Sequence, residues 1–559
     1  MRADNYLPQW TEPASAEEGG RDPLGLARVH DRITEWLVPG ITTQTHRARY
    51  YSYYLWAVGD VNAIDAPGRR HEFEEGMRRR EAGFVLACLA DHDGDGPAAL
   101  VGVRQGERRW RSQFQSGSFR TDFQPLPSML AGGYGQYYGG SLYNLGLVHT
   151  PVEANGVDRL TPLGQTIAAA FSVAVADTEY IKEGMQGLPE LGLATAQDYG
   201  KHACLCRLRS ATKADLGPLT DLFFGMGEHN RPEAVPRRET LLLCLDAVSA
   251  ANKHKIEVAK GAFDALVVSC CAFYGHLLRG KRSVRYGAPK PLTTCAQRWR
   301  WLELHRYTSY ALERLLSALL TRLNDAQKRM SLDEFVRDLD WGKMSQTARE
   351  FAPGLRGADL RGWVGAVLGS GGAISEQGSL QFDRSHGLSA DLSEDGLGSQ
   401  LAESDDLNEQ VALSVLLLLT LYCRFNHCRG RDPRWMENAQ RGDGELWFEV
   451  VARRIDDHLS KKANVAQFLV DLLDRDVLDG HERMRFERGK LDASWLERDG
   501  AMLTWQRDYR PPWRSSKMEN CGTILEDLGL LHVDEDGLVE VAPRGAALRS
   551  RLLAEMGEG

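Results

Sequence analysis

Arginine and histidine recur in this sequence at a spacing that could act on a phosphodiester. Three pairs are separated by four or five residues: Arg300 and His305, Arg453 and His458, and Arg475 and His481. A histidine can move a proton near neutral pH, and an arginine can hold a phosphate through two N–H groups. Because the spacing occurs three times in unrelated surroundings, chance supplies it easily. A surface arginine beside a capping or core histidine is the competing interpretation.

The pair Arg300 and His305 stands out because it lies in a basic and aromatic stretch, residues 279–310. Here eight cations face one acid, Glu303, in a chain whose formal net charge is −9. The cations are Arg279, Lys281, Arg282, Arg285, Lys290, Arg298, Arg300 and Arg306, and the interleaved rings are Tyr286, Trp299, Trp301, Tyr307 and Tyr310. Cations beside stackable rings are typical of a site that follows a nucleic-acid backbone. Alternatively, arginine stems cover a helix surface while the tryptophans belong to the core.

The Arg-x4-6-His spacing resembles the motif of small helical ribonucleases of the HEPN type. This resemblance implies metal-independent cleavage of RNA, with His305 and Arg300 acting on the 2′-hydroxyl and the scissile phosphate. Other catalytic motifs give no support, since the sequence has no GxxxxGK[ST] phosphate loop, no HExxH, no GxSxG and no kinase signature.

Two groups of soft ligands could hold a metal ion. They are His202, Cys204 and Cys206, and Cys423, His427 and Cys428. Neither group has the paired CxxC spacing of a structural zinc site, so we expect buried thiols, no metal and no cofactor. The turn that begins at Asp91 opens like an EF-hand loop, but Gly102 stands where the bidentate glutamate belongs. We therefore expect an exposed acidic turn there.

The composition bounds the class of protein. The chain has 559 residues, of which 43% are hydrophobic and 26% charged, with 68 Lys and Arg against 77 Asp and Glu. The acidic excess argues against a surface that coats nucleic acid everywhere, but it permits a local basic face. The longest apolar run, residues 411–423, is too short to span a membrane and predicts a buried helix. With no apolar signal segment in residues 1–20 and ten irregularly spaced cysteines, we expect a cytoplasmic protein with reduced thiols.

One pattern occurs twice, 383 positions apart. The first copy is Leu142-Tyr-Asn-Leu-Gly-Leu-Val-His149, and the second is Leu525-Glu-Asp-Leu-Gly-Leu-Leu-His532. Each copy is followed by Pro-x-Gly, at 162–164 and 543–545, and then by an apolar helical pattern. We expect each copy to form a helix that ends at its glycine in the left-handed conformation, two short strands, and a new helix.

This order of elements resembles the winged-helix family, at about residues 100–173 and 505–553. In DNA-binding members the helix before the wing enters the major groove and should carry cations. Here the candidate helices, 135–145 and 516–528, carry only Lys517. The basic residues lie upstream of the first unit, at Arg104, Arg108, Arg109, Arg111 and Arg120, and around the start of the second, at Arg507, Arg510, Arg514 and Lys517. They could follow phosphates without reading bases.

Helical periodicity dominates the chain, which predicts a mainly α, multidomain fold with two winged-helix units that carry short β-ribbons. We expect an N-terminal helical domain at 1–98, a winged-helix unit at 99–175 and a central helical domain at 176–364. A flexible acidic Gly/Ser-rich linker or loop at 365–408 would separate these from a C-terminal helical domain at 409–504 and a second winged-helix unit at 505–559.

The sequence thus predicts a non-enzymatic subunit of a bacterial assembly, with the backbone of DNA or RNA and other protein subunits, such as an ATPase or a nuclease, as partners, and no membrane. It is loosely similar to accessory proteins of anti-phage defence loci and to kleisin-type subunits. Two alternatives remain open. One is a HEPN-like ribonuclease, and the other is a protein-only scaffold that uses winged helices as interaction modules.

Overall fold

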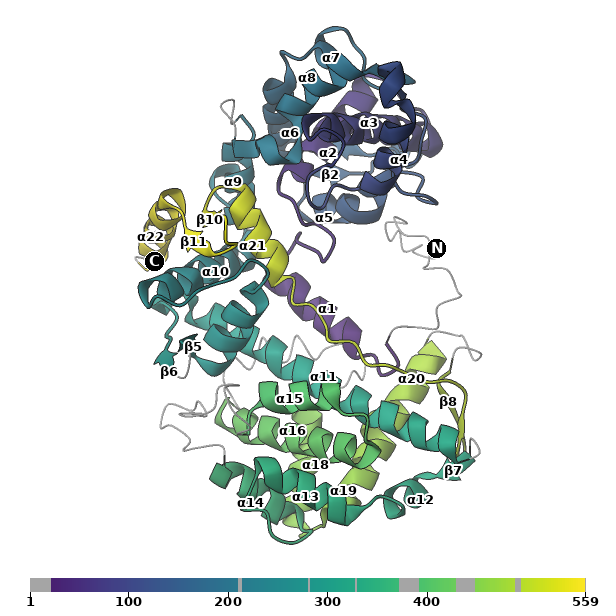
Figure 1. Ribbon diagram of the computed structural model, residues 1–559, viewed down its shortest axis with the longest axis vertical. Helices are drawn as coiled ribbons and strands as arrows, with labels where there is room; N and C mark the ends of the chain where they lie inside the picture. Colours follow the sequence, from purple (N-terminus) through teal and green to yellow (C-terminus); the bar gives the residue numbers. More distant parts are fainter. Residues whose placement is uncertain are drawn as a thin grey trace.

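The computed structural model describes residues 22–209, 214–279, 282–326, 329–370, 392–428, 448–487 and 494–557. Across these ranges the chain is mainly α-helical, as predicted, with small sheets of two or three strands. Figure 1 shows an elongated molecule with an upper lobe, a middle part and a lower lobe. No described helix is long and apolar enough to cross a membrane.

The upper lobe surrounds one helix, α2. Its helices are α2 (Arg49–Ile64), α3 (Arg70–Asp91), α4 (Val103–Gln113), α5 (Gly139–Asn144), α6 (Pro162–Val175), α7 (Glu179–Lys182) and α8 (Leu193–Ala203). Strand β1 (Ser118–Arg120) pairs with β4 (Glu190–Gly192), and β2 (Val148–His149) pairs with β3 (Arg159–Leu160), both antiparallel. The tyrosines of α2 at 50, 51, 53 and 54 are fully buried, so this helix is the centre of the lobe.

The predicted boundary near residue 98 does not separate two folded units. Helix α2 packs against α6, and α3 packs along α8. The ring of Tyr50 lies 4.9 Å from that of Tyr138. Residues before and after 98 therefore share one core. The physical reason is that α2 carries aromatic side chains on all its faces and needs partners on every side.

The middle part is arranged around α10. It contains α1 (Leu26–Leu37), α9 (Leu216–Phe224), α10 (Val235–Lys253), the π-helix η7 (Asp264–Tyr274), and the hairpin of β5 (His276–Arg279) and β6 (Arg282–Arg285). It also contains the C-terminal elements α21 (Met518–Asp527), β10 (Leu531–Val533), β11 (Val539–Val541) and α22 (Pro543–Gly557). Helix α10 packs against α9, η7, α21 and α22, so it joins chain segments distant in sequence (Figure 1).

The lower lobe is built on the long helix α11 (Thr293–Asp325), which packs against α1, η7 and α16. Its other helices are α12 (Leu332–Arg337), α13 (Trp341–Phe351), α14 (Leu360–Ser370), α15 (Glu394–Glu403), α16 (Leu407–Cys428), α18 (Phe448–Ser460), α19 (Val465–Leu472), η9 (Leu473–Leu478) and α20 (Asp479–Glu487). Strands β7 (Arg329–Ser331), β8 (Leu496–Asp499) and β9 (Met502–Trp505) form a sheet in the order β7-β9-β8. The apolar run 411–423 lies inside α16 and is buried, as predicted.

The expected linker at 365–408 is folded wherever the structure describes it. Helix α14 continues to residue 370, and α15 begins at Glu394; residues 371–391 lie outside the described ranges. Glu394 is fully buried and forms a two-point ion pair with Arg424. The Ser393 hydroxyl accepts a hydrogen bond from the Gly396 amide and caps α15. Glu394 therefore lies in the first turn of α15 and pairs with a core arginine, a role that a composition count does not reveal.

The two copies of the repeated pattern fold alike. Each forms a helix, a two-stranded antiparallel hairpin and a second helix: α5, β2, β3 and α6 in the first copy, and α21, β10, β11 and α22 in the second. Gly146 and Gly529 both end the first helix in the left-handed region, at φ 68° and 66°. The amide after each glycine donates to the carbonyl five residues earlier, Leu147 to Leu142 and Leu530 to Leu525, both at 2.9 Å.

Candidate nucleic-acid interface and ligand clusters

Helix α4 presents arginines on one exposed face. Arg104, Arg108 and Arg111 follow each other at four and three residues and are all exposed. This spacing places them along one side of a helix. The opposite side packs inward, because a Cβ at Gly106 would lie 2.4 Å from Cγ1 of Val85, and Trp110 is buried. The helix is therefore fixed with its basic face outward, at the rim of the upper lobe (Figure 1).

The neighbouring arginines of this region are held by one acid. Arg109 lies 3.2 Å from Asp122 and over the ring of Phe123, and Arg120 pairs with the same carboxylate at 2.6 Å. The side chain of Arg111, in contrast, is 77% exposed and only 3.3 Å from Glu107 in a surface i,i+4 pair. Surface pairs of this kind contribute little free energy, so Arg111 can exchange its partner for a phosphate.

The stretch 279–310 is divided between surface and core. Arg285 is exposed and Arg298 and Arg300 are half-buried, whereas Arg306 is buried. Arg279 and Arg282 lie on the hairpin strands β5 and β6 without described side chains, and Lys281 lies outside the described residues. Trp299 and Trp301 are core residues, and the indole of Trp299 donates to Thr240 Oγ1 at 3.0 Å. The interpretation as one continuous basic and aromatic site is therefore wrong.

Arg306 is an internal cation rather than a phosphate ligand. Its guanidinium contacts both carboxylate oxygens of Asp264, at 3.0 and 2.8 Å, and Glu303 at 2.8 Å. Burial raises the pKa of Glu303 to about 7, although Arg306 opposes this shift. The positive charge of Arg306 therefore compensates the buried Glu303 and the half-buried Asp264 at the junction of η7 and α11.

Some of the basic residues around the start of the second copy are paired with acids or buried within the chain. Arg514 binds Glu313 of α11, and Lys517 is buried, with a left-handed backbone (φ 66°), at the start of α21. Arg507 stacks over the ring of Trp495, 4.6 Å from its centroid, while Arg510 is exposed. The expected phosphate-tracking role is therefore wrong for Arg514 and Lys517, because buried acids and packing occupy them.

The structure places His305 where it cannot meet RNA. His305 is fully buried, and its Nε2 lies 3.0 Å from the Leu26 carbonyl oxygen. Burial lowers the pKa of His305 to about 3, so the ring is neutral at physiological pH. Arg300 donates through Nε to the Ala272 carbonyl at 3.0 Å. The histidine is a core residue, and the pair lacks the exposed geometry that phosphodiester cleavage requires.

The helix before the hairpin differs in role between the two copies. In the second copy, α21 is buried along most of its length, including Asn520, Gly522 and Asp527. A Cβ at Gly522 would lie 2.2 Å from the ring of Phe263, so this helix is tightly enclosed. In the first copy, Tyr143 and Asn144 of α5 are exposed. The second copy therefore cannot insert its helix into a groove without leaving the rest of the chain.

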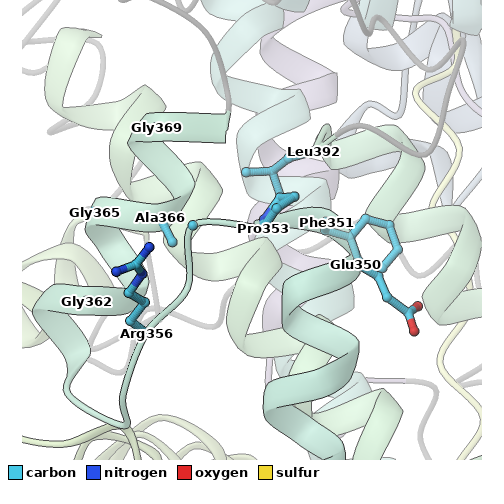
Figure 2. Close-up of a pocket in the computed structure, with 10 residues that line it drawn as sticks. Glu350, Phe351, Pro353, Arg356, Gly362, Gly365, Ala366, Gly369 and Leu392 are labelled. Carbon is cyan, nitrogen blue, oxygen red and sulfur yellow. The ribbon is translucent and has the colours of Figure 1, made fainter.

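A cavity of about 560 Å³ lies between α13 and α14 in the lower lobe. Figure 2 shows that its wall consists largely of backbone and small residues, with Gly362, Gly365 and Gly369 on one side. Glu350 and Arg356 are its charged lining residues, and their side chains lie apart from each other in this view. Catalysis needs polar groups that converge on one point, so this cavity offers no active-site geometry.

A smaller cavity of about 300 Å³ lies beside the β5–β6 hairpin. Its lining includes Arg285, Arg300, His276 and Tyr286. The hydroxyl of Tyr286 donates to Asp246 at 2.7 Å, and Asp246 also binds Arg549 of α22. This cavity combines cations with a ring, but it is framed by side chains that hold the C-terminal helix in place.

Among the described residues, one cluster brings together side chains that can ligate a metal ion, with their ligand atoms close to one another. Asp91, His92, Cys204 and Cys206 each offer one ligand atom, and these atoms lie within 4.8 Å of one another. The sequence paired His202 with the two cysteines and treated Asp91 as part of an exposed turn. The structure replaces His202 by His92. No local spacing could have shown this, because more than one hundred residues separate the two halves of the cluster.

Cys423 is buried in α16, and the side chains of His427 and Cys428 are not described. The donor atoms of the second expected group, Cys423, His427 and Cys428, therefore cannot be placed relative to one another. The prediction that its thiols are buried holds for Cys423.

No family model, no curated protein and no solved structure matches this chain. The fold and the candidate sites are therefore defined by the geometry of this chain alone. They define a mainly α-helical, multi-lobed chain that carries two copies of a helix–hairpin–helix unit.

Proposed function

We propose that this chain is a non-enzymatic subunit that contacts the phosphate backbone of DNA or RNA through helix α4. The observation that carries the proposal is the exposed row of Arg104, Arg108 and Arg111 on a helix whose other face is fixed in the core. The row spans seven residue steps, from Arg104 to Arg111, or about 10 Å of helix. Each strand of a duplex places one phosphate about every 3.4 Å along its axis, so three arginines can meet several phosphates.

The location of the row supports the same function. It lies on α4, upstream of the first helix–hairpin–helix unit. We propose that α4 and this unit together form a winged-helix module, in which α5 keeps exposed residues. The acidic net charge of the chain keeps its other surfaces from binding nucleic acid without specificity. Contact through arginines positions a protein on a backbone without reading bases. We therefore expect weak sequence preference.

Salt-dependent binding tests the proposal. A labelled DNA duplex and a labelled RNA are titrated with the full chain between about 50 and 200 mM salt, and affinity is measured by fluorescence anisotropy. The variant R104Q/R108Q/R111Q should make the slope of log K against log salt less steep by about 2.7 on duplex DNA, since each phosphate contact contributes about 0.9. Its affinity at low salt should fall by about tenfold or more.

A matched control removes the same charge elsewhere. R349Q/R361Q/R453Q changes three exposed arginines of the lower lobe and should bind like the parent chain. If the parent shows no binding at about 50 mM salt, or if the two triple variants bind alike, the proposed contact through α4 is wrong.

A protein-only scaffold is the second candidate. Its supporting observation is that α21 of the second unit docks onto α10 and η7 of the same chain rather than facing outward. One unit is thus used for protein packing, and the other could bind a partner subunit in the same way. Absence of nucleic-acid binding, together with retention of a protein partner by the α4 variant, would favour this function.

A further inference from the structure

We infer that Asp91, His92, Cys204 and Cys206 form a binding site for one zinc ion. The inference is independent of the function of α4. It rests on which ligand atoms meet, how closely they meet, and what holds them there.

The spacing of the donor atoms fits a tetrahedral ion. Four donors at about 2.0–2.3 Å from one zinc ion lie about 3.3–3.8 Å from one another. Sγ of Cys206 lies 3.3 Å from Nε2 of His92, 3.5 Å from Oδ2 of Asp91 and 3.5 Å from Sγ of Cys204. Nε2 of His92 lies 3.8 Å from Oδ2 of Asp91. These four of the six edges fall in the tetrahedral range, and every pair of donor atoms lies within 4.8 Å.

Two packed helices bring these donors together. Asp91 is the last residue of α3 and His92 follows it, while Cys204 follows α8 directly. The helices α3 and α8 pack side by side, and a Cβ at Gly200 would lie 2.2 Å from the carbonyl oxygen of Ala87, so their approach is close. The backbone of Cys204 is held by Arg49, which donates to its carbonyl at 2.7 Å. The donors are therefore positioned before any ion binds.

A neighbouring cation completes the charge balance. Arg207 donates to both oxygens of Asp91, at 2.9 and 2.6 Å. Each carboxylate oxygen has two acceptor positions, so Asp91 can bind an ion and Arg207 at the same time. Two thiolates, one carboxylate, one zinc ion and one guanidinium sum to zero. Such outer contacts orient metal ligands and strengthen binding.

The donor set selects the kind of ion. Thiolates and an imidazole favour zinc over magnesium or calcium, which prefer oxygen ligands. Four protein donors leave no open position for water or substrate, so the site is structural rather than catalytic. A bound ion would lock the end of α3 to the turn after α8. It would thereby fix the point where the chain leaves the upper lobe (Figure 1).

Metal analysis of the full chain tests the site. The protein is purified with reductant, supplied with zinc and dialysed, and the metal is counted by mass spectrometry. We expect about one zinc ion per chain. Cobalt in place of zinc should give the intense visible bands of a tetrahedral ion and a thiolate-to-metal charge-transfer band. The variants C206S and H92A should lose the ion and these bands.

Two controls separate binding from folding. C270S removes a cysteine outside the cluster, and H202A removes the histidine that the sequence placed beside Cys204; both should keep the ion. Circular dichroism shows whether C206S and H92A are folded. If the parent chain retains no zinc or cobalt, if C206S and H92A keep the ion, or if Cys204 and Cys206 are recovered as a disulfide after purification with reductant, the inference is wrong.

Discussion

The guanidinium of Arg47 binds the carboxylate of Asp527, 480 residues later in the chain. Three nitrogen–oxygen distances of 2.9 to 3.1 Å join them, and the Ala48 amide donates to the same carboxylate at 2.9 Å. Arg47 lies just before α2 of the upper lobe, and Asp527 is the last residue of α21. One buried ion pair thus connects the N-terminal lobe to the second helix–hairpin–helix unit.

Breaking this pair should destabilise the chain. The side chains are only 12% and 9% exposed, so removal of one partner leaves a buried charge without compensation. We expect R47A or D527A to lower the free energy of unfolding by about 3–5 kcal/mol, measured by urea unfolding. The double variant should lose less than the sum of the two. R79A, at an exposed pair, should change stability by about 0.5 kcal/mol at most; equal effects of R79A and R47A would contradict this assignment.

Glu81 should make stability depend on pH. It is fully buried, where it accepts hydrogen bonds from Tyr54 Oη at 2.7 Å and from the Gly133 amide, and burial raises its pKa from 4.5 to about 7. In this interval the folded state binds a proton that the unfolded state has lost. The contribution of Glu81 to the free energy of unfolding is therefore complete below pH 4.5. It falls by about 3 kcal/mol in total as pH rises to about 7.

The variant E81Q isolates this contribution, because glutamine cannot ionise. Urea unfolding at several pH values should show that the difference in stability between the parent and E81Q changes across this interval. It should favour E81Q more at pH 7 than at pH 4.5. A difference that stays constant with pH would show that Glu81 does not keep its proton in the folded state.

Gly164 and Gly545 should resist substitution equally. A Cβ at Gly164 would lie 2.1 Å from the Leu147 carbonyl oxygen, and one at Gly545 would lie 2.1 Å from that of Leu530. We expect G164A and G545A each to cost about 1–3 kcal/mol, measured by urea unfolding, because the obstacle is backbone. Gly140, in helix α5, has open space, so G140A should stabilise by up to about 1 kcal/mol. A neutral G545A would show that the two copies differ in packing.

His305 should weaken the chain in acid rather than cleave RNA. Its pKa is lowered by burial from 6.5 to about 3, so below pH 6.5 only the unfolded state takes up the proton. Stability is complete above pH 6.5 and falls by about 1.4 kcal/mol per pH unit as pH drops toward 3. H305Q should flatten this fall in urea unfolding. Cleavage of RNA that depends on His305 would contradict the core role.

Local signals in the sequence were sufficient for the repeated unit. The Leu-Gly-Leu and Pro-x-Gly patterns fix hydrogen bonds between residues a few positions apart, such as Leu147 to Leu142, and these form regardless of what lies outside. The apolar run inside α16 predicted a buried helix for the same reason. Helix periodicity also predicted the mainly α fold.

The positions of arginines in the sequence did not predict which of them are exposed to solvent. Arg108 and Arg306 both lie in basic stretches of the sequence. Arg108 is exposed on α4, whereas Arg306 is buried and pairs with Asp264 and Glu303. Exposure depends on which elements pack against each helix, and these lie far away along the chain. The expectation of a single basic site at 279–310 was wrong because it counted residues without knowing their neighbours.

The helices, the buried apolar segments and the two matching hairpin units could be predicted from the residues alone, because they follow from contacts between near neighbours. Long-range packing, in contrast, sets which arginines are exposed, buries His305 in the core, and brings His92 rather than His202 to Cys204 and Cys206. Those outcomes depend on the packing of α3 against α8 and of α21 against α10. Packing of this kind brings together side chains whose positions in sequence carry no common signal.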